Sequence, residues 1–422
     1  MRYDVAIIGA GADGLAAASL LARAGRKVVV LERAAHAGGR CVTSEFAPGF
    51  HASPYADTVA APPPMLLPLL GLPEGLIEDF APVGADIVQR RTRALARVLA
   101  EAVKLPPHGL VERLKAALPQ LHRPWPGSDW ADRSITELRA HSGQNDWRAA
   151  LAGGFAPSEP GSALALIWRA SLEMAGQSGA LALAVPGTLM AALRRASNAE
   201  VQTDWMVAEI LVTRGRAVGV RLQDGDMVGA RAVLSSRTRS ASEALAGLDR
   251  PQTFSEAGDA RIVFTLGDGV ALPPAVAAGR CFAALPTADC ADAYEAARAG
   301  RLPPLVPFSV TAETPRSLVV DLPLMPVSPP QGWGALKAPL AATLVKTLSR
   351  HVSGLARVLT GVTVTSPRLR PRASLAQLLA PAFERAVTRV PGLYLCGEDA
   401  EPVPCVSGRA GRFAAHFALK SR

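Results

Sequence analysis

A glycine-rich turn between an apolar strand and a helix opens the chain and constrains its fold more than any other feature. Residues 3–8 form an apolar run of strand length, and Gly9-Ala10-Gly11-Ala12-Asp13-Gly14 follows it. An alanine- and leucine-rich stretch over 15–24 predicts a helix that ends at Gly25, before a second apolar strand over 27–31. That strand runs into Glu32, which places an acid about 20 residues beyond the turn, as in a βαβ dinucleotide-binding unit.

The three glycines of this turn have different expected roles. Gly9 allows the tight turn, Gly11 lets the backbone approach a pyrophosphate, and Gly14 lets the helix pack closely on the strand. The helix N-terminus offers N–H groups and the positive end of its dipole to the phosphates. Glu32 is expected to accept hydrogen bonds from ribose hydroxyls and to repel a 2′-phosphate. The alternative, a turn that binds nothing, is disfavoured by the strand–turn–helix–strand context.

A second glycine pair, Gly38-Gly39, lies just past the second strand and is followed by Arg40. Glycines here let another loop approach the same pyrophosphate, and Arg40 adds a charge-assisted donor. The run V-V-V-L-E-R-x(5)-G-G-R resembles the FAD-binding start of amine oxidases, protoporphyrinogen oxidases and carotenoid (phytoene) desaturases. Residues 41–51 look like the phytoene-dehydrogenase-related branch, with its pattern T-x-E-x-x-P-G-F. The resemblance implies that the nucleotide is FAD and not NAD.

Two later segments extend the resemblance along the chain. Residues 185–236 alternate apolar positions with glycine turns, which predicts a β-meander whose backbone at Val207 meets the adenine. Residues 390–399 and 406–415 are similar to the family's closing FAD motif, in which Glu398 binds the ribityl chain. A helix beginning near Ser407 is expected to point its N-terminus at the flavin pyrimidine. In all, the turn and the resemblance assign cofactor contacts to Gly9, Gly11, Ala12, Asp13, Gly14, Glu32, Arg33, Gly39, Arg40, Val207, Gly397, Glu398 and Val406.

Composition excludes several other classes of site. The five cysteines are odd in number and without C-x-x-C spacing, which argues against a disulfide framework, a zinc site or a redox dithiol. The seven scattered histidines form no metal-ligand pattern, so no metal is expected. The first strand begins at once, which leaves no room for a signal peptide and makes a reducing cytoplasm the expected compartment.

The net charge of +9 has two readings. The basic residues are mostly arginine, which suggests a coding bias, and no basic block with interleaved aromatics predicts nucleic-acid binding. Attraction to an anionic membrane surface, at the inner face of the membrane, stays open. The apolar stretch 59–72 has 14 residues with four prolines and cannot span a bilayer. It is either a buried connection of the core, the reading we favour, or an exposed lip that touches lipid.

The length of 422 residues predicts two domains. The motifs and the resemblance imply an α/β fold, with a Rossmann-type FAD-binding domain and an inserted mixed α+β substrate domain. We place the first over 1–70, 181–250 and 385–422, and the second over 71–180 and 251–384. Within the second we expect broken helices over 84–150, with a capping box at Ser134 and Glu137. Further on we expect strands at 262–266, 318–322 and 362–365 and a helix over 340–350.

A flavin carries the redox chemistry itself, so an enzyme that uses one needs no strong catalytic motif, and the sequence shows none. Candidate catalytic residues are His51, Cys405 and Arg409, each with an ordinary structural role as the alternative. Asp399 and Glu401 are further candidate bases, and surface acids are the simpler interpretation. The chain departs from related desaturases at 401–406, where E-P-V-P-C-V replaces the usual H-P-G-G-G-V. The departure puts ordinary carotenoid desaturation in doubt.

The resulting hypothesis is an FAD-dependent oxidoreductase (desaturase, dehydrogenase or isomerase) that acts on an apolar, lipid- or isoprenoid-like substrate by hydride transfer to flavin. Electrons would pass to a quinone or oxygen. A flavin amine oxidase and an FAD-binding accessory protein with little turnover are the alternatives. The aromatic content of 5% argues against the aromatic cage of an amine oxidase. A homo-oligomer and a peripheral membrane contact remain open.

Overall fold

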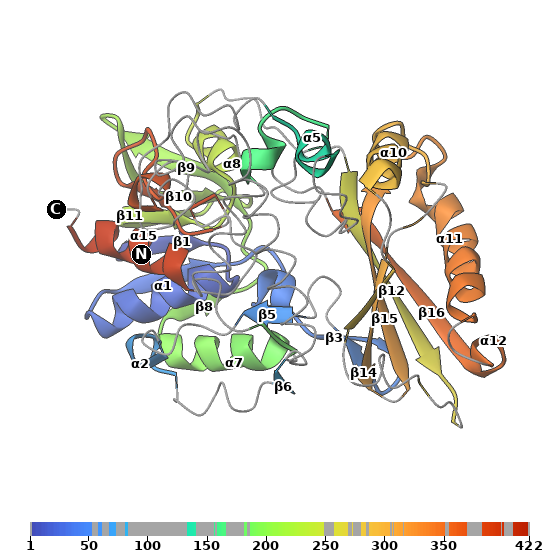
Figure 1. Cartoon of the computed structure of the whole chain (residues 1–422). Helices are drawn as coiled ribbons and strands as arrows, with labels where there is room; N and C mark the ends of the chain where they lie inside the picture. The colour runs from blue at the N-terminus through green and yellow to red at the C-terminus, as the bar shows by residue number, and fades with distance from the viewer. Residues whose placement is uncertain are drawn as a thin grey trace.

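A computed structural model of the chain shows two bodies joined by several crossings (Figure 1). The described residues are 2–52, 58–60, 67–72, 81–82, 133–140, 156, 158–165, 181–183, 186–248, 257–268, 272, 280–283, 287–303, 306, 308–314, 316–350, 354–368, 382–397, 399–400 and 408–420.

The first body is built on a seven-stranded sheet with the order β8-β2-β1-β11-β10-β9, in which β17 also pairs with β11. The pairs of β1 with β2 and β11, of β2 with β8, and of β11 with β17 are parallel, whereas β9 and β10 form an antiparallel meander with β11. The strands are β1 (Arg2–Ile8), β2 (Val28–Leu31), β8 (Glu200–Gln202), β9 (Val207–Thr213), β10 (Arg216–Leu222), β11 (Met227–Ser235) and β17 (Leu393–Leu395).

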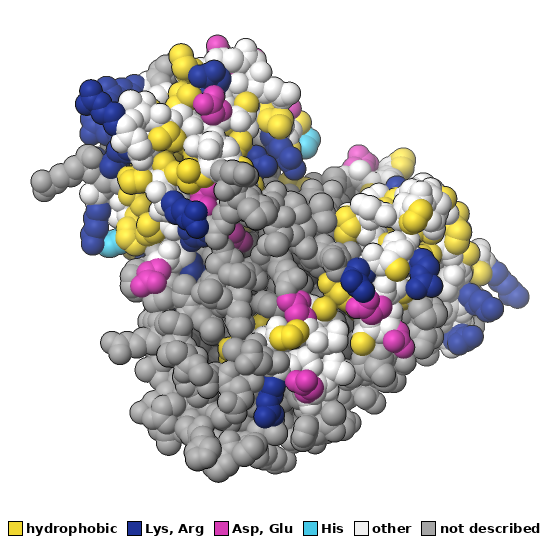
Figure 2. All heavy atoms as spheres, turned by 90° about the horizontal axis from the view of Figure 1, so that it is seen from above, with side chains coloured by type: hydrophobic (Ala, Val, Ile, Leu, Met, Phe, Trp, Pro, Cys, Tyr) yellow, Lys and Arg dark blue, Asp and Glu magenta, His cyan; other side chains and the backbone are white. Residues whose placement is uncertain are grey.

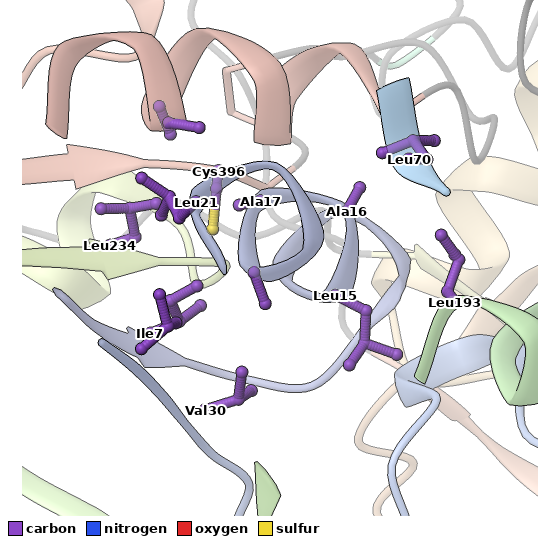
Figure 3. Close-up of a cluster of buried hydrophobic side chains, with 14 of the residues drawn as sticks. Ile7, Leu15, Ala16, Ala17, Leu21, Val30, Leu70, Leu193, Leu234 and Cys396 are labelled. Atoms are coloured by element: carbon purple, nitrogen blue, oxygen red, sulfur yellow. The ribbon is translucent and has the colours of Figure 1, made fainter. Parts of the chain in front are cut away.

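Helix α1 (Ala12–Arg23) lies at the centre of the first core. Its side chains pack on the sheet on one side and on α7 (Pro186–Ser197) and α15 (Arg409–Lys420) on the other sides. Figure 3 shows Ile7, Leu15, Leu21 and Val30 converging there. α15 approaches α1 so closely that a Cβ on Gly411 would lie 2.4 Å from a backbone oxygen of α1. The alanine-rich sequence of α1 permits this spacing.

The second body is a five-stranded antiparallel sheet with the order β13-β14-β15-β12-β16. α11 (Gly332–Leu348) covers one face of it, and the apolar side chains of that face form a separate core (Figure 1). The elements are β12 (Ala257–Leu266), β13 (Arg280–Ala283), α10 (Thr287–Arg298), β14 (Phe308–Thr314), β15 (Ser317–Pro326), α12 (Leu355–Val358) and β16 (Leu359–Arg368).

Short elements connect the bodies. Phe46, in the hairpin of β3 (Ser44–Ala47) and β4 (Phe50–Ala52), packs on Val263 and Val319 of the second sheet. The remaining short elements are η1 (Gly39–Cys41), β5 (Thr58–Ala60), α2 (Leu67–Leu70), β6 (Ala81–Pro82), α5 (Ile135–Ala140), β7 (Leu181–Leu183), α8 (Arg239–Leu245) and α14 (Ala382–Arg385), of which β5, β7 and β6 form a small three-stranded sheet.

The predicted α/β class with a Rossmann-type unit is confirmed, and the second sheet is more extensive than expected. β12, β15 and β16 each have ten residues, and α11 begins at Gly332 rather than at 340. The capping box is present in both directions: Ser134 Oγ accepts from the Glu137 N–H at 3.2 Å, and Glu137 Oε2 accepts from the Ser134 N–H at 3.0 Å.

The described end of the apolar stretch belongs to the core. Leu67, Leu70 and Leu72 are buried, and the Ser19 hydroxyl of α1 donates to the Leu70 carbonyl at 2.7 Å. Leu69 is 47% exposed. The burial of Leu67, Leu70 and Leu72 agrees with the interpretation of this stretch as a connection in the core. Residues 61–66 lie outside the described part. Within the described part of the chain, no helix is both long and apolar enough to cross a membrane.

Candidate functional site

The carboxyl ends of β2, β1, β11 and β17 meet at one edge of the first sheet, because these strands are parallel neighbours. Ligands of open α/β sheets bind outside this edge. The glycine-rich turn lies here, where Gly9 N donates to the Leu31 carbonyl at 2.8 Å and Ser236 N donates to the Ile8 carbonyl at 3.0 Å. The turn is thus attached to both strands that flank β1.

The glycines of the turn divide into two that the fold requires and one that it does not. Gly9 has φ +97°, and a Cβ there would lie 2.1 Å from Ser236 Oγ. A Cβ on Gly14 would lie 2.2 Å from the Gly9 carbonyl oxygen. Gly11 precedes α1 in an ordinary extended conformation, and a Cβ on it would meet no protein atom within 4 Å. The protein itself does not need a glycine at position 11, so the open space there fits a ligand.

Glu32 lies beside this turn with its carboxylate held by the backbone. The residue is buried, its Oε2 accepts from the Ala10 N–H at 2.8 Å, and its Oε1 accepts from the Ala34 N–H at 3.0 Å. Each carboxylate oxygen has a second lone pair for another donor. The two bonds therefore orient the acid at the strand edge.

The second glycine pair lies over the turn. Gly38 N donates to the Ala10 carbonyl at 2.8 Å. Gly39 has φ +58°, and its added Cβ would lie 3.1 Å from the Gly11 Cα. The side chain of Arg40 lies outside the described part. The two loops approach each other at the position where a pyrophosphate is expected.

Two further arginines bring positive charge to the same edge. Arg33 follows Glu32, and Arg237 follows the end of β11. Burial lowers the pKa of the Arg237 guanidinium, and the positive charge of Arg33 lowers it further. The positive charges of Arg33 and Arg237 repel each other, so an anion bound between or beside them would be stabilised.

The turn after β17 is fixed on the end of β11. Cys396 N donates to the Ser235 carbonyl at 2.8 Å, and a Cβ on Gly397 would lie 2.2 Å from the Ser236 carbonyl oxygen. Asp399 Oδ2 accepts from the Arg239 N–H at 2.6 Å. The Asp399 carboxylate therefore binds the backbone at the start of α8. Arg239 was not predicted, since nothing in the sequence near it indicates a contact 160 residues away.

The remaining predicted residues are spread around the first body. Val207 is buried at the start of β9, Asp13 lies in the first turn of α1, and Arg409 begins α15. Burial raises the pKa of the Cys396 thiol, and the Asp13 charge raises it further, which makes this thiol a poor nucleophile. The side chain of His51 and the whole of Glu398, Glu401, Cys405, Val406 and Ser407 lie outside the described residues. Within the described ranges, no group of three His, Cys, Asp or Glu residues is placed to hold a metal.

Residues 7–64 match the family model described as "NAD(P)-binding Rossmann-like domain". The chain carries a domain of this type. All-trans-retinol 13,14-reductase of Homo sapiens is 49% identical over 55 residues, which are 12% of this chain and 9% of that protein. A limonene dehydrogenase component of Castellaniella defragrans is 48% identical over 66 residues, 15% of this chain and 12% of that protein. The match thus spans about a tenth of each curated relative's length.

Solved structures share the fold along almost the whole chain. Cyclohexylamine oxidase from Brevibacterium oxydans has a TM-score of 0.63 at 14% identity, covering 99% of both chains. Putrescine oxidase bound to putrescine has a TM-score of 0.62 at 15% identity, covering 100% of this chain and 99% of that one. A CLA-producing fatty acid isomerase from P. acnes has a TM-score of 0.58 at 12% identity, covering 99% and 98%. These likenesses show a common fold.

Proposed function

We propose that this protein is an FAD-dependent oxidoreductase. The observation that carries the proposal is the open space at Gly11, beside the first turn of α1 and within reach of the Gly39 loop. A diphosphate fits there because unpaired N–H groups and the helix dipole favour negative charge. Glu32 is oriented beside it to accept from a ribose hydroxyl. Together these residues fit the adenosine diphosphate half of the cofactor.

The other half is assigned by the resemblance. The backbone at Val207 would lie against the adenine, and Glu398 would bind the ribityl chain. The bound flavin would supply the redox chemistry by accepting a hydride equivalent from the substrate. The chain's own part is to bind and orient the cofactor: Gly11 leaves space for it, Glu32 would accept from the ribose, and Asp399 is bonded to the start of α8.

The substrate that we propose is apolar, of lipid or isoprenoid type, with a quinone or oxygen as electron acceptor. The names of the two relatives, a retinol reductase and a limonene dehydrogenase, support this class, as does the fatty acid isomerase among the structures of the same fold. The second candidate is a flavin amine oxidase. Putrescine oxidase and cyclohexylamine oxidase, which share the fold over the whole chain, favour it.

Peripheral membrane contact also remains a proposal. Its support is the net charge of +9 and the exposed Leu69 next to a buried helix face. Figure 2 shows apolar and basic side chains interspersed on the described surface of both bodies. An anionic lipid surface would attract the basic groups, and salt would weaken the attraction.

Anaerobic reduction of the bound flavin tests the function and separates the candidates. The purified protein is mixed without oxygen with retinol, limonene and linoleic acid in one series, and with putrescine and cyclohexylamine in another. Loss of the oxidised flavin spectrum in the first series alone supports the apolar substrate, and loss in the second alone supports the amine oxidase. If no compound reduces the flavin while dithionite does, a protein with little turnover is favoured. The Gly11→Val variant is the matched control, because it should lack the flavin.

A further inference from the structure

A closed ring of hydrogen bonds joins three segments that lie far apart in the sequence. The segments are the start of α8 at Arg239, the end of α14 at Arg385, and the turn after β17 at Asp399 and Ala400. The Arg239 N–H donates to Asp399 Oδ2 at 2.6 Å. The Arg239 guanidinium donates through Nη2 to the Arg385 carbonyl at 2.8 Å. Arg385 Nε in turn donates to the Ala400 carbonyl at 3.0 Å, which closes the ring.

The ring is partly buried and is supported on both sides. Arg385 is 6% exposed and Glu243 is fully buried, and Glu243 Oε1 lies 3.8 Å from Arg239 Nη1. Arg239 Nη1 also donates to the Val387 carbonyl. Arg239 donates to several acceptors at once, and the bond from Arg385 Nε is buried, where an unpaired donor would cost free energy. The ring is therefore a rigid attachment.

The segment that the ring holds is the turn at the carboxyl end of β17. A Cβ on Gly397 would lie 2.2 Å from the Ser236 carbonyl oxygen, and Ala400 N donates to the Gly397 carbonyl at 2.9 Å. β17 is the neighbour of β11, and β11 is the neighbour of β1, whose end carries the glycine-rich turn. The clamped turn thus belongs to the same ligand-binding edge as Gly11.

We propose that Asp399 and Arg239 are positioning residues for the flavin half of the cofactor. They would act through the backbone at Gly397 and Ala400, which they fix relative to the end of β11. The proposal rests on the proposed function, because only a bound flavin gives this turn a ligand. It assigns the Asp399 carboxylate to the backbone contact and not to proton transfer.

Two variants test the ring, and a third provides a matched control. Asp399→Ala removes the acceptor of the Arg239 N–H, and Arg239→Lys removes the paired bonds to the carbonyls of 385 and 387. Tyr3→Phe deletes one hydrogen bond, of 2.7 Å to Glu200, from the same sheet far from this edge. For each protein, FAD affinity, the absorbance spectrum and the reduction potential of the flavin are measured together with the thermal unfolding temperature.

Asp399→Ala is expected to weaken FAD by about tenfold to a hundredfold, the equivalent of one lost charge-assisted hydrogen bond, and to shift the flavin spectrum and potential. Asp399→Asn keeps an acceptor oxygen and should restore much of the affinity. Tyr3→Phe should leave the flavin unchanged. The proposal is overturned if Asp399→Ala binds FAD with the wild-type spectrum and potential, or if Tyr3→Phe perturbs the flavin equally at equal loss of stability. A wild-type protein that binds no FAD would instead refute the proposed function.

Discussion

Replacement of Gly11 by valine should abolish cofactor binding and leave the fold intact. The backbone of Gly11 has φ −73° and ψ 176°, which any L-residue adopts, and its added Cβ meets nothing within 4 Å. Such a substitution changes stability by no more than about 1 kcal/mol, since it mainly restricts the unfolded chain. The apoprotein should therefore unfold near the wild-type temperature.

The loss of binding can be estimated from the hydrogen bonds that a diphosphate would make. If the valine side chain keeps the phosphates from two backbone N–H groups, each charge-assisted bond costs about 1.5–3 kcal/mol. The sum of about 3–6 kcal/mol corresponds to a weakening of FAD by roughly two to four orders of magnitude.

Gly14→Ala is the matched contrast to Gly11→Val. Its Cβ would lie 2.2 Å from a backbone oxygen, so it should destabilise the apoprotein by about 1–3 kcal/mol or more. Denaturant unfolding of the apoproteins and titration with FAD separate the two effects. A Gly11→Val protein that keeps its yellow colour and wild-type affinity would refute the placement of the pyrophosphate.

Glu32→Ala should weaken FAD by about 1–3 kcal/mol in a titration, because it removes the ribose acceptor, and an unchanged affinity would show that the acid contacts no ribose. Burial, the hydrogen bond to Glu200 and the charge of Glu200 raise the pKa of Tyr3 to about 12. The folded state thus holds this proton more tightly, so its stabilising effect is complete below pH 10 and is lost as pH rises from 10 to 12. Tyr3→Phe should flatten that part of the stability curve, and an identical alkaline slope in both proteins would exclude the tyrosine. Leu67→Glu should unfold the protein, because Leu67 is 2% exposed, while Leu69→Glu should fold normally. Flotation with anionic liposomes at low salt tests membrane contact through α2, which predicts that the wild type floats and Leu69→Glu does not. A wild-type protein that stays in solution would exclude membrane contact.

The first βαβ unit could be predicted because its information is local. Strand and helix periodicities, the glycine turn and the final acid all lie within 32 residues, and each element meets its neighbour directly. The capping box at Ser134 is local in the same sense. The predicted position of Glu32 beside the turn follows from the parallel pairing of β1 and β2.

The second sheet was predicted only in part because long-range pairing extends its strands. The first half of β12 contains Gly258, Asp259 and Arg261, which break the apolar pattern, yet these residues pair with β15 and β16. α11 begins eight residues before its predicted start, although Pro339 lies inside it. The bond from Trp333 Nε1 to the Pro326 carbonyl, at 2.8 Å, fixes the start of this helix on the preceding strand.

The contacts of Arg239 and Asp399 lay beyond sequence reasoning for a similar reason. A carboxylate that accepts from a backbone N–H leaves no pattern in the sequence, and this donor is 160 residues away. Position 399 is next to a predicted ribityl-binding residue, so proximity alone suggested a catalytic base. The fold shows that this carboxylate accepts from the Arg239 N–H.

The nucleotide that the purified protein releases on denaturation tests the central claim most directly. The protein is unfolded with heat or guanidinium, and the supernatant is separated by chromatography against FAD, FMN and NAD standards. The open space at Gly11, the oriented Glu32 and the clamped turn at 397–400 predict FAD, released intact and in proportion to the yellow protein. Release of FMN or NAD without FAD, together with an apoprotein that does not bind added FAD, would contradict the account.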